Sequence, residues 1–168
     1  MTTQLAEKFP VRGFVRWLMR FPIWLYRAHV GGLLGNRFLM LTHVGRKSGL
    51  LRQVVIEVVS HDARADTYVV ASAWGEKSDW FLNIQKTPEV NVHVRIRQFE
   101  ARAIRLPEDE ATQALRDYAQ HHPFAFRELG KLMMGQSLSD SEEDCRRLAQ
   151  SVPLVALQPK VSISRRPV

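Results

Sequence analysis

Short segments rich in Val and Ile alternate with tight polar or glycine-containing turns through the middle of the chain, and this pattern limits the fold more than any other feature. Because parallel strands need long crossover connections, consecutive strands joined by such short turns are expected to pair antiparallel. The predicted strands are residues 37–44, 53–60, 67–73, 89–95, 98–106 and 154–157. The sequence therefore predicts a sheet of about six mostly antiparallel strands.

Helices are predicted around this sheet. One begins at Ser78, a good N-cap residue, and ends near Lys86 because Pro88 forbids its continuation. The other predicted helices are residues 107–121, 123–134 and 141–150. A chain of 168 residues can bury a sufficient core without metal or disulfide. The sequence thus predicts an α+β barrel in a single domain.

Positive charge is concentrated near the N-terminus. Residues 1–52 contain nine Lys and Arg and one Glu, whereas the rest of the chain carries 15 basic and 16 acidic residues. Between residues 9 and 21, apolar side chains recur at helical spacing and arginines follow on another face. We therefore expect three parts, which are an N-terminal basic amphipathic helical segment (residues 1–36), a barrel domain (37–160) and a basic tail (161–168).

The basic helix permits two interpretations. Its arginine stripe and flanking tryptophans suit a helix that lies in an anionic membrane surface through residues 9–30. They equally suit a helix that caps the barrel with solvated arginines. No nucleic-acid partner is expected, because the arginines lack the aromatic stacking platform of a single-strand binder. No run of 18 apolar residues exists, so no membrane-spanning helix is expected either.

Other features of the composition exclude several kinds of chemistry. Cys145 is the only cysteine and cannot form an internal disulfide, which favours a reducing, cytoplasmic compartment. No pair of histidines has metal-site spacing with supporting carboxylates, so no metal is expected. Nucleophile-elbow, P-loop and dinucleotide-binding motifs are missing from the sequence. Common hydrolase, NTPase and Rossmann-type functions are therefore not favoured.

Residues 45–49 (Gly-Arg-Lys-Ser-Gly) form the strongest candidate binding element. Two glycines allow a tight turn that approaches a ligand closely, and Arg46, Lys47 and the nearby Arg52 concentrate positive charge. Ser48 adds a hydroxyl group. By itself this segment suits either a phosphate or carboxylate cradle or an ordinary solvated turn.

Two downstream motifs accompany this turn, Val-Ala-Ser at residues 70–72 and Asp-Trp-Phe-Leu-Asn at residues 79–83. As a set, the three motifs resemble those of the deazaflavin-dependent nitroreductase/quinone reductase family, whose members use coenzyme F420 on a split β-barrel. The resemblance is good over residues 38–106 and weaker over residues 22–27 and 153–159. It implies a split β-barrel of the FMN-binding type with bound F420.

The resemblance also implies a site. The cofactor's phosphate and acidic tail would meet Arg46, Lys47 and Arg52 in the cradle that contains Ser48. The deazaflavin ring would be lined by Val54, Val55, Ala71, Ser72 and Ala73, and closed by Trp80 and Asn83. A flat, largely apolar ring with a charged tail needs such an apolar wall and such a basic exit.

The implied activity is hydride transfer from reduced F420 to a small-molecule acceptor, which would be a quinone, a nitro compound or an activated alkene. Ser72 and Tyr118 are the candidate catalytic hydrogen-bond or proton donors. The segment 73–77 and Val55 depart from the pattern of the nitroimidazole-activating members, so the acceptor stays open. The alternatives are an FMN-binding protein or a non-catalytic, membrane-peripheral split-barrel protein that binds a cofactor or lipid. A homodimer also stays open.

Overall fold

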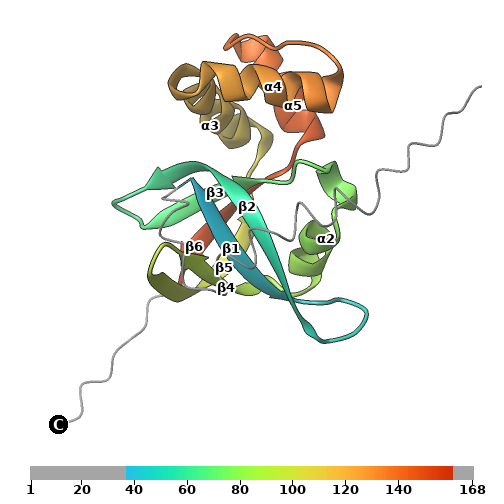
Figure 1. Ribbon diagram of the computed structural model, residues 1–168, viewed down its shortest axis with the longest axis vertical. Coiled ribbons are helices and arrows are strands. Elements are labelled where there is room, and N and C mark those ends of the chain that lie inside the picture. Colours follow the sequence, from blue (N-terminus) through green and yellow to red (C-terminus); the bar gives the residue numbers. More distant parts are fainter. Residues whose placement is uncertain (1–36, 161–168) are drawn as a thin grey trace, which may run out of the picture.

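The computed structural model describes residues 37–160, which form a six-stranded barrel, a short helix beside it and a layer of three helices (Figure 1). The strands are β1 (Phe38–Val44), β2 (Leu51–Asp62), β3 (Thr67–Ala71), β4 (Glu89–Val94), β5 (Arg97–Arg105) and β6 (Leu154–Pro159). They close in the order β1-β2-β3-β6-β5-β4, and every neighbouring pair is antiparallel. The antiparallel barrel predicted from the sequence is confirmed.

The register between β1 and β2 decides which side chains reach the barrel interior. The two strands pair from Phe38 opposite Glu57 to Val44 opposite Leu51, so β2 is two residues longer at each end than the predicted segment 53–60. Alternate residues, among them Leu41 of β1 and Val54 of β2, contact the core inside the barrel. His43 and Arg52 are paired with each other and continue this alternation toward the end of both strands.

The barrel interior is closed by α2 (Asp79–Lys86), whose Trp80, Phe81 and Ile84 join the barrel core. The helix was predicted to begin with Ser78 as its cap, but the Ser78 side chain makes no capping hydrogen bond. Its hydroxyl lies 2.8 Å from that of Ser72 instead. Ser78 is thus the N-cap residue as predicted, although its side chain contacts Ser72 and not the first turn of the helix.

The third predicted strand is also shorter than expected. β3 stops at Ala71 and not at residue 73. The backbone N–H of Ser72 donates to the carbonyl of Pro153 at 2.9 Å, and the chain then turns into the 3₁₀ helix η2 (Gly75–Lys77). Gly75 has a φ of +68°, a conformation that favours glycine. The strand ends because the chain must turn here to bring α2 under the barrel.

Helices α3 (Glu108–His121), α4 (Pro123–Met134) and α5 (Glu142–Ser151) lie between β5 and β6 in sequence. Figure 1 shows them gathered on one side of the barrel, away from α2. Their buried side chains, including Leu115 and Leu148, form a second core that also contacts the outward-facing Val59 and Val69. Cys145 lies in this core, where burial and the nearby acids raise the pKa of its thiol to about 11. The helix layer therefore covers one outer face of the barrel and does not cover α2.

The predictions for residues 1–36, including the helix over residues 9–30, and for the tail 161–168 concern parts of the chain outside the described residues. Within residues 37–160, no helix has the length and apolar character needed to cross a membrane. The same residues contain no group of three or more His, Cys, Asp or Glu placed to hold a metal ion.

Candidate functional site

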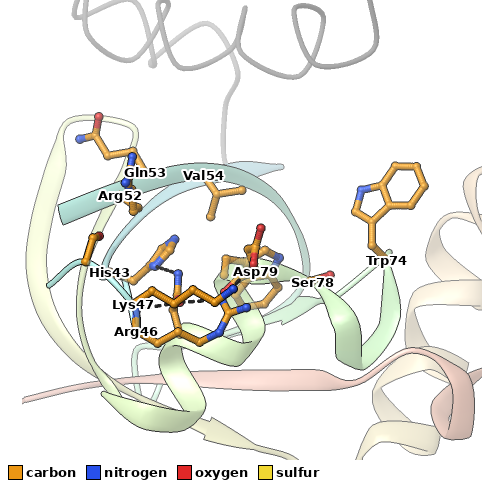
Figure 2. Close-up of a pocket in the computed structure, with 13 residues that line it drawn as sticks. His43, Arg46, Lys47, Arg52, Gln53, Val54, Trp74, Ser78 and Asp79 are labelled. Atoms are coloured by element: carbon orange, nitrogen blue, oxygen red, sulfur yellow. Dashed lines mark hydrogen bonds and ion pairs between the residues drawn. The ribbon is translucent and has the colours of Figure 1, made fainter. Parts of the chain in front are cut away.

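A cavity of about 570 Å³ opens where the β1–β2 turn meets α2. One side is cationic, with Lys47 and Arg52, and the other side carries Trp74 (Figure 2). Val54 and Trp80 supply apolar surface between them. The cavity therefore combines a basic side with an apolar wall, which is what a flat ring with an anionic tail requires.

The β1–β2 turn takes its shape from its two glycines. Gly45 and Leu50 close the turn through a backbone hydrogen bond of 2.8 Å, and Gly49 donates back to Gly45, also at 2.8 Å. A Cβ atom at Gly45 would lie only 2.9 Å from the Ser48 hydroxyl oxygen, and Gly49 has a φ of +68°. Neither position accepts a larger residue without rearrangement. Both glycines are thus required for this backbone path.

Arg46 ties the turn to α2. Its guanidinium Nη1 lies 2.9 Å from Asp79 Oδ1 and 3.0 Å from Asn83 Oδ1. Its backbone N–H also donates to Asn83 Oδ1, at 3.0 Å, and its carbonyl accepts a hydrogen bond from Lys86 Nζ at 3.1 Å. These contacts join residues about forty positions apart in the sequence. Arg46 therefore holds the β1–β2 turn against α2.

Lys47 and Arg52 differ from Arg46. Both are exposed, both line the cavity, and within residues 37–160 neither forms an ion pair with an acid. Among the described residues, Asp79 is the only carboxylate that lines this cavity, and it already pairs with Arg46. The positive potential of Lys47 and Arg52 is therefore left for an anion from solution.

His43 and Asn83 form a buried pair on the floor of the cavity. They are 4% and 5% exposed, and His43 Nδ1 lies 3.2 Å from Asn83 Nδ2. Burial lowers the pKa of His43, and the neighbouring cation Arg52 lowers it further, against the opposing effects of the Val44 backbone and Asp79. The imidazole is consequently neutral at pH 7.

The model of the F420H(2)-dependent quinone reductase family matches residues 18–128, which is well over half of the chain. The chain belongs to this family. It is therefore an oxidoreductase, an F420-dependent reductase whose cofactor is coenzyme F420.

Solved structures support the fold of this F420-dependent reductase. A structure described as an F420-H2 dependent reductase aligns with a TM-score of 0.52 at 17% identity, covering 74% of this chain and 96% of the other. A structure described as a domain-swapped dimer also gives 0.52, at 16% identity, covering 82% and 99%. A protein of unknown function from Agrobacterium tumefaciens gives 0.51 at 16% identity, covering 93% and 59%. At these identities the likeness concerns the barrel fold alone.

The structure brings most of the predicted cofactor-binding residues of this reductase to one cavity. Seven of them line it: Arg46, Lys47, Ser48, Arg52, Val54, Trp80 and Asn83. Val55 does not, because strand alternation turns it to the outer face while Val54 faces inward. Ala71, Ser72 and Ala73 do not line it either. Ser72 is fully buried, with its hydroxyl 2.8 Å from both the Gly75 carbonyl and the Ser78 hydroxyl, so it stabilises the turn before α2.

Tyr118 also lies away from the cavity. It sits on α3 in the core under the helix layer, and its hydroxyl donates to Glu57 at 2.8 Å. Burial and this carboxylate together raise the pKa of the phenol far above its usual value. Tyr118 is therefore a structural residue that joins α3 to β2, and the structure does not bring it to the acceptor side of the reductase.

Sequence reasoning missed His43 and Trp74, which both line the cavity. For His43 a signal exists: Leu39, Leu41 and His43 share one face of β1, so a buried strand places the imidazole at the mouth of the barrel. For Trp74 the sequence offers less indication, because this residue reaches the cavity only through the position that η2 takes in the folded chain.

The residues present fit the cofactor that the family requires. In the described part of the chain, Lys47 and Arg52 on the cavity wall form no ion pair, and the one carboxylate there, Asp79, is already paired with Arg46. Between these cations and Trp74 lies the apolar side chain of Val54 (Figure 2). Lys47, Ser48 and Arg52 would hold the anionic tail, and Val54 and Trp80 would contact the ring.

Proposed function

We propose that this reductase binds F420 with its anionic tail at Lys47 and Arg52 and its ring between Val54 and Trp80, and that it reduces a flat electrophilic acceptor. A quinone, a nitro compound or an activated alkene meets this description. When bound, the reduced cofactor supplies a hydride to the acceptor. The observation that carries the proposal is a single cavity with free cations on one side and an exposed aromatic residue on the other.

Trp74 is the residue that we assign to the acceptor. It is 57% exposed although it is large and apolar, and Figure 2 shows it across the cavity from Arg52 and Gln53. An indole face left open to solvent offers a flat surface for stacking a planar acceptor. The protein's other contribution is to hold the acceptor against the ring and exclude water.

Replacing Trp74 with alanine is expected to raise KM for a quinone such as 2-methyl-1,4-naphthoquinone by roughly three- to tenfold, because one aromatic stacking contact is lost. The affinity for F420, measured by fluorescence titration, should change by less than about twofold on the same argument. The matched control is Phe124→Ala, which removes an aromatic side chain that is 72% exposed on α4, far from the cavity.

The three acceptor classes are compared in the same assay, with FMN titrated beside F420. Reduction of none of the three classes by F420H2 would contradict the proposed function, as would binding of FMN in preference to F420. If Trp74→Ala weakens F420 binding and leaves KM unchanged, Trp74 covers the cofactor and the acceptor enters from another side.

A membrane contact, a dimer and the three-part division of the chain are proposals too. The excess of basic residues in positions 1–52 supports attraction of residues 9–30 to an anionic membrane surface. The structure described as a domain-swapped dimer, with a similar barrel, supports a homodimer here. The single Cys145, buried as a free thiol, supports a reducing cytoplasmic location.

A further inference from the structure

The orientation of the Asn83 side chain is fixed by a partner that can only donate. The backbone N–H of Arg46 lies 3.0 Å from Asn83 Oδ1, and an amide N–H has no acceptor role. The carboxamide oxygen must therefore face Arg46. The amide nitrogen, Nδ2, then faces His43 Nδ1 at 3.2 Å.

This orientation determines where His43 carries its proton. Asn83 Nδ2 can only donate, so His43 Nδ1 must accept and carries no hydrogen. A neutral imidazole holds one proton, which is consequently on Nε2. Burial is the main cause of the lowered pKa of His43. The cation Arg52 on β2 lowers this pKa further, while the Val44 backbone and Asp79 on α2 oppose the shift. The ring stays neutral at pH 7 and above.

The remaining ring nitrogen reaches the cavity. His43 lines the cavity, and Figure 2 shows its ring on the floor with one nitrogen directed toward the side of Val54. His43 is almost completely buried, whereas Lys47 and Arg52 are exposed at the rim. The part of a ligand that enters deepest therefore meets His43, and the charged tail stays at the rim.

We propose that His43 donates a hydrogen bond through Nε2 to a carbonyl oxygen or ring nitrogen on the polar edge of bound deazaflavin, and that Asn83 and Arg46 set this donor in place. This inference rests on the proposed placement of the ring. An uncharged donor suits an uncharged carbonyl acceptor, since it adds direction without a further buried charge. His43 thus selects how the ring is seated, while the cations retain the tail.

The test is a long-range ¹H–¹⁵N spectrum of the full chain with ¹⁵N-labelled histidine at pH 7.5, recorded with and without F420. The chain contains six histidines, and His43→Phe identifies the signals of residue 43. The expected result for the free protein is an unprotonated Nδ1 and a protonated Nε2. Saturation with F420 should then shift the Nε2 signal while the pattern of protonation persists.

Binding measurements complete the test. His43→Phe keeps a ring but removes the donor, and should weaken F420 binding roughly tenfold, as loss of one hydrogen bond predicts. His43→Gln keeps an N–H donor and should stay within about threefold of the wild type on the same scale. Circular dichroism and thermal unfolding check that each variant is folded.

The outcomes separate the two proposals. A proton on Nδ1 in the free protein overturns the inference whatever the cofactor does, and so does an Nε2 signal that does not move when fluorescence shows F420 to be bound. Failure of F420 to saturate the wild-type chain overturns the proposed function, and the placement of His43 against the ring falls with it.

Discussion

Replacing Lys47 and Arg52 together with alanine is expected to weaken F420 binding by about 100-fold or more. Each side chain would lose a charge-assisted hydrogen bond, and each such bond accounts for roughly a tenfold change in affinity. Both side chains are exposed and neither is paired with an acid inside residues 37–160, so the fold should be almost unaffected. The measurement is a fluorescence titration with F420 at several salt concentrations.

The salt dependence distinguishes this effect from a general loss of packing. Binding to the wild type should weaken as salt rises, because exposed charges are screened, and this dependence should flatten in the double variant. The control is Arg64→Ala with Arg102→Ala, which removes the same charge from exposed positions that do not line the cavity. If the control weakens binding as much as the double variant, the protein's net charge, and not a local cradle, attracts the cofactor.

Replacing Asn83 with alanine is expected to lower the free energy of unfolding by about 2 kcal/mol and to weaken F420 binding as well. The substitution leaves the Arg46 N–H and His43 Nδ1 without their partner, and each unsatisfied buried group costs about 1–3 kcal/mol. The higher helix propensity of alanine offsets roughly 0.6 kcal/mol of this loss. Urea denaturation of the free protein measures the stability term separately from the cofactor.

Gln85→Ala is the matched control, because Gln85 is an exposed residue on the same helix. It should leave the unfolding midpoint unchanged or slightly raised, since only propensity changes there. An Asn83→Ala protein as stable as this control would show that the hydrogen bonds to Arg46 and His43 contribute nothing to the fold. It would contradict the view that Asn83 holds the β1–β2 turn in place before the cofactor binds.

The barrel could be predicted because its strands carry their burial pattern in the sequence. Val90, Val92 and Val94 face the core in the structure as their alternation predicts, and the helix ends at proline and capping positions were close to those observed. Local composition and period are enough to locate such elements.

The site could be predicted only in part, because it depends on which face each residue takes and on contacts distant in sequence. Once the register of β2 against β1 is known, strand alternation directs Val54 into the cavity and Val55 to the outer face. That register could not be predicted from the sequence. Ser72 lies just beyond the end of β3, where its backbone N–H donates to the carbonyl of Pro153, a residue 81 positions away that no local signal connects to it. The ion pair of Arg46 with Asp79 could likewise not be predicted from the sequence.

The contact of Arg46 with α2 links cofactor binding to the local folding equilibrium of the β1–β2 turn. The turn at residues 45–49 has the shape proposed to hold the cofactor only while Arg46 keeps it against α2, through hydrogen bonds between segments far apart in the chain. A species with the turn detached has no preformed cradle, so the ligand binds the closed species alone and shifts the population toward it. At a concentration of 100 times Kd the shift amounts to about 2.7 kcal/mol. Cofactor binding should therefore suppress opening of this turn, and amide hydrogen exchange in residues 45–49 would measure that suppression.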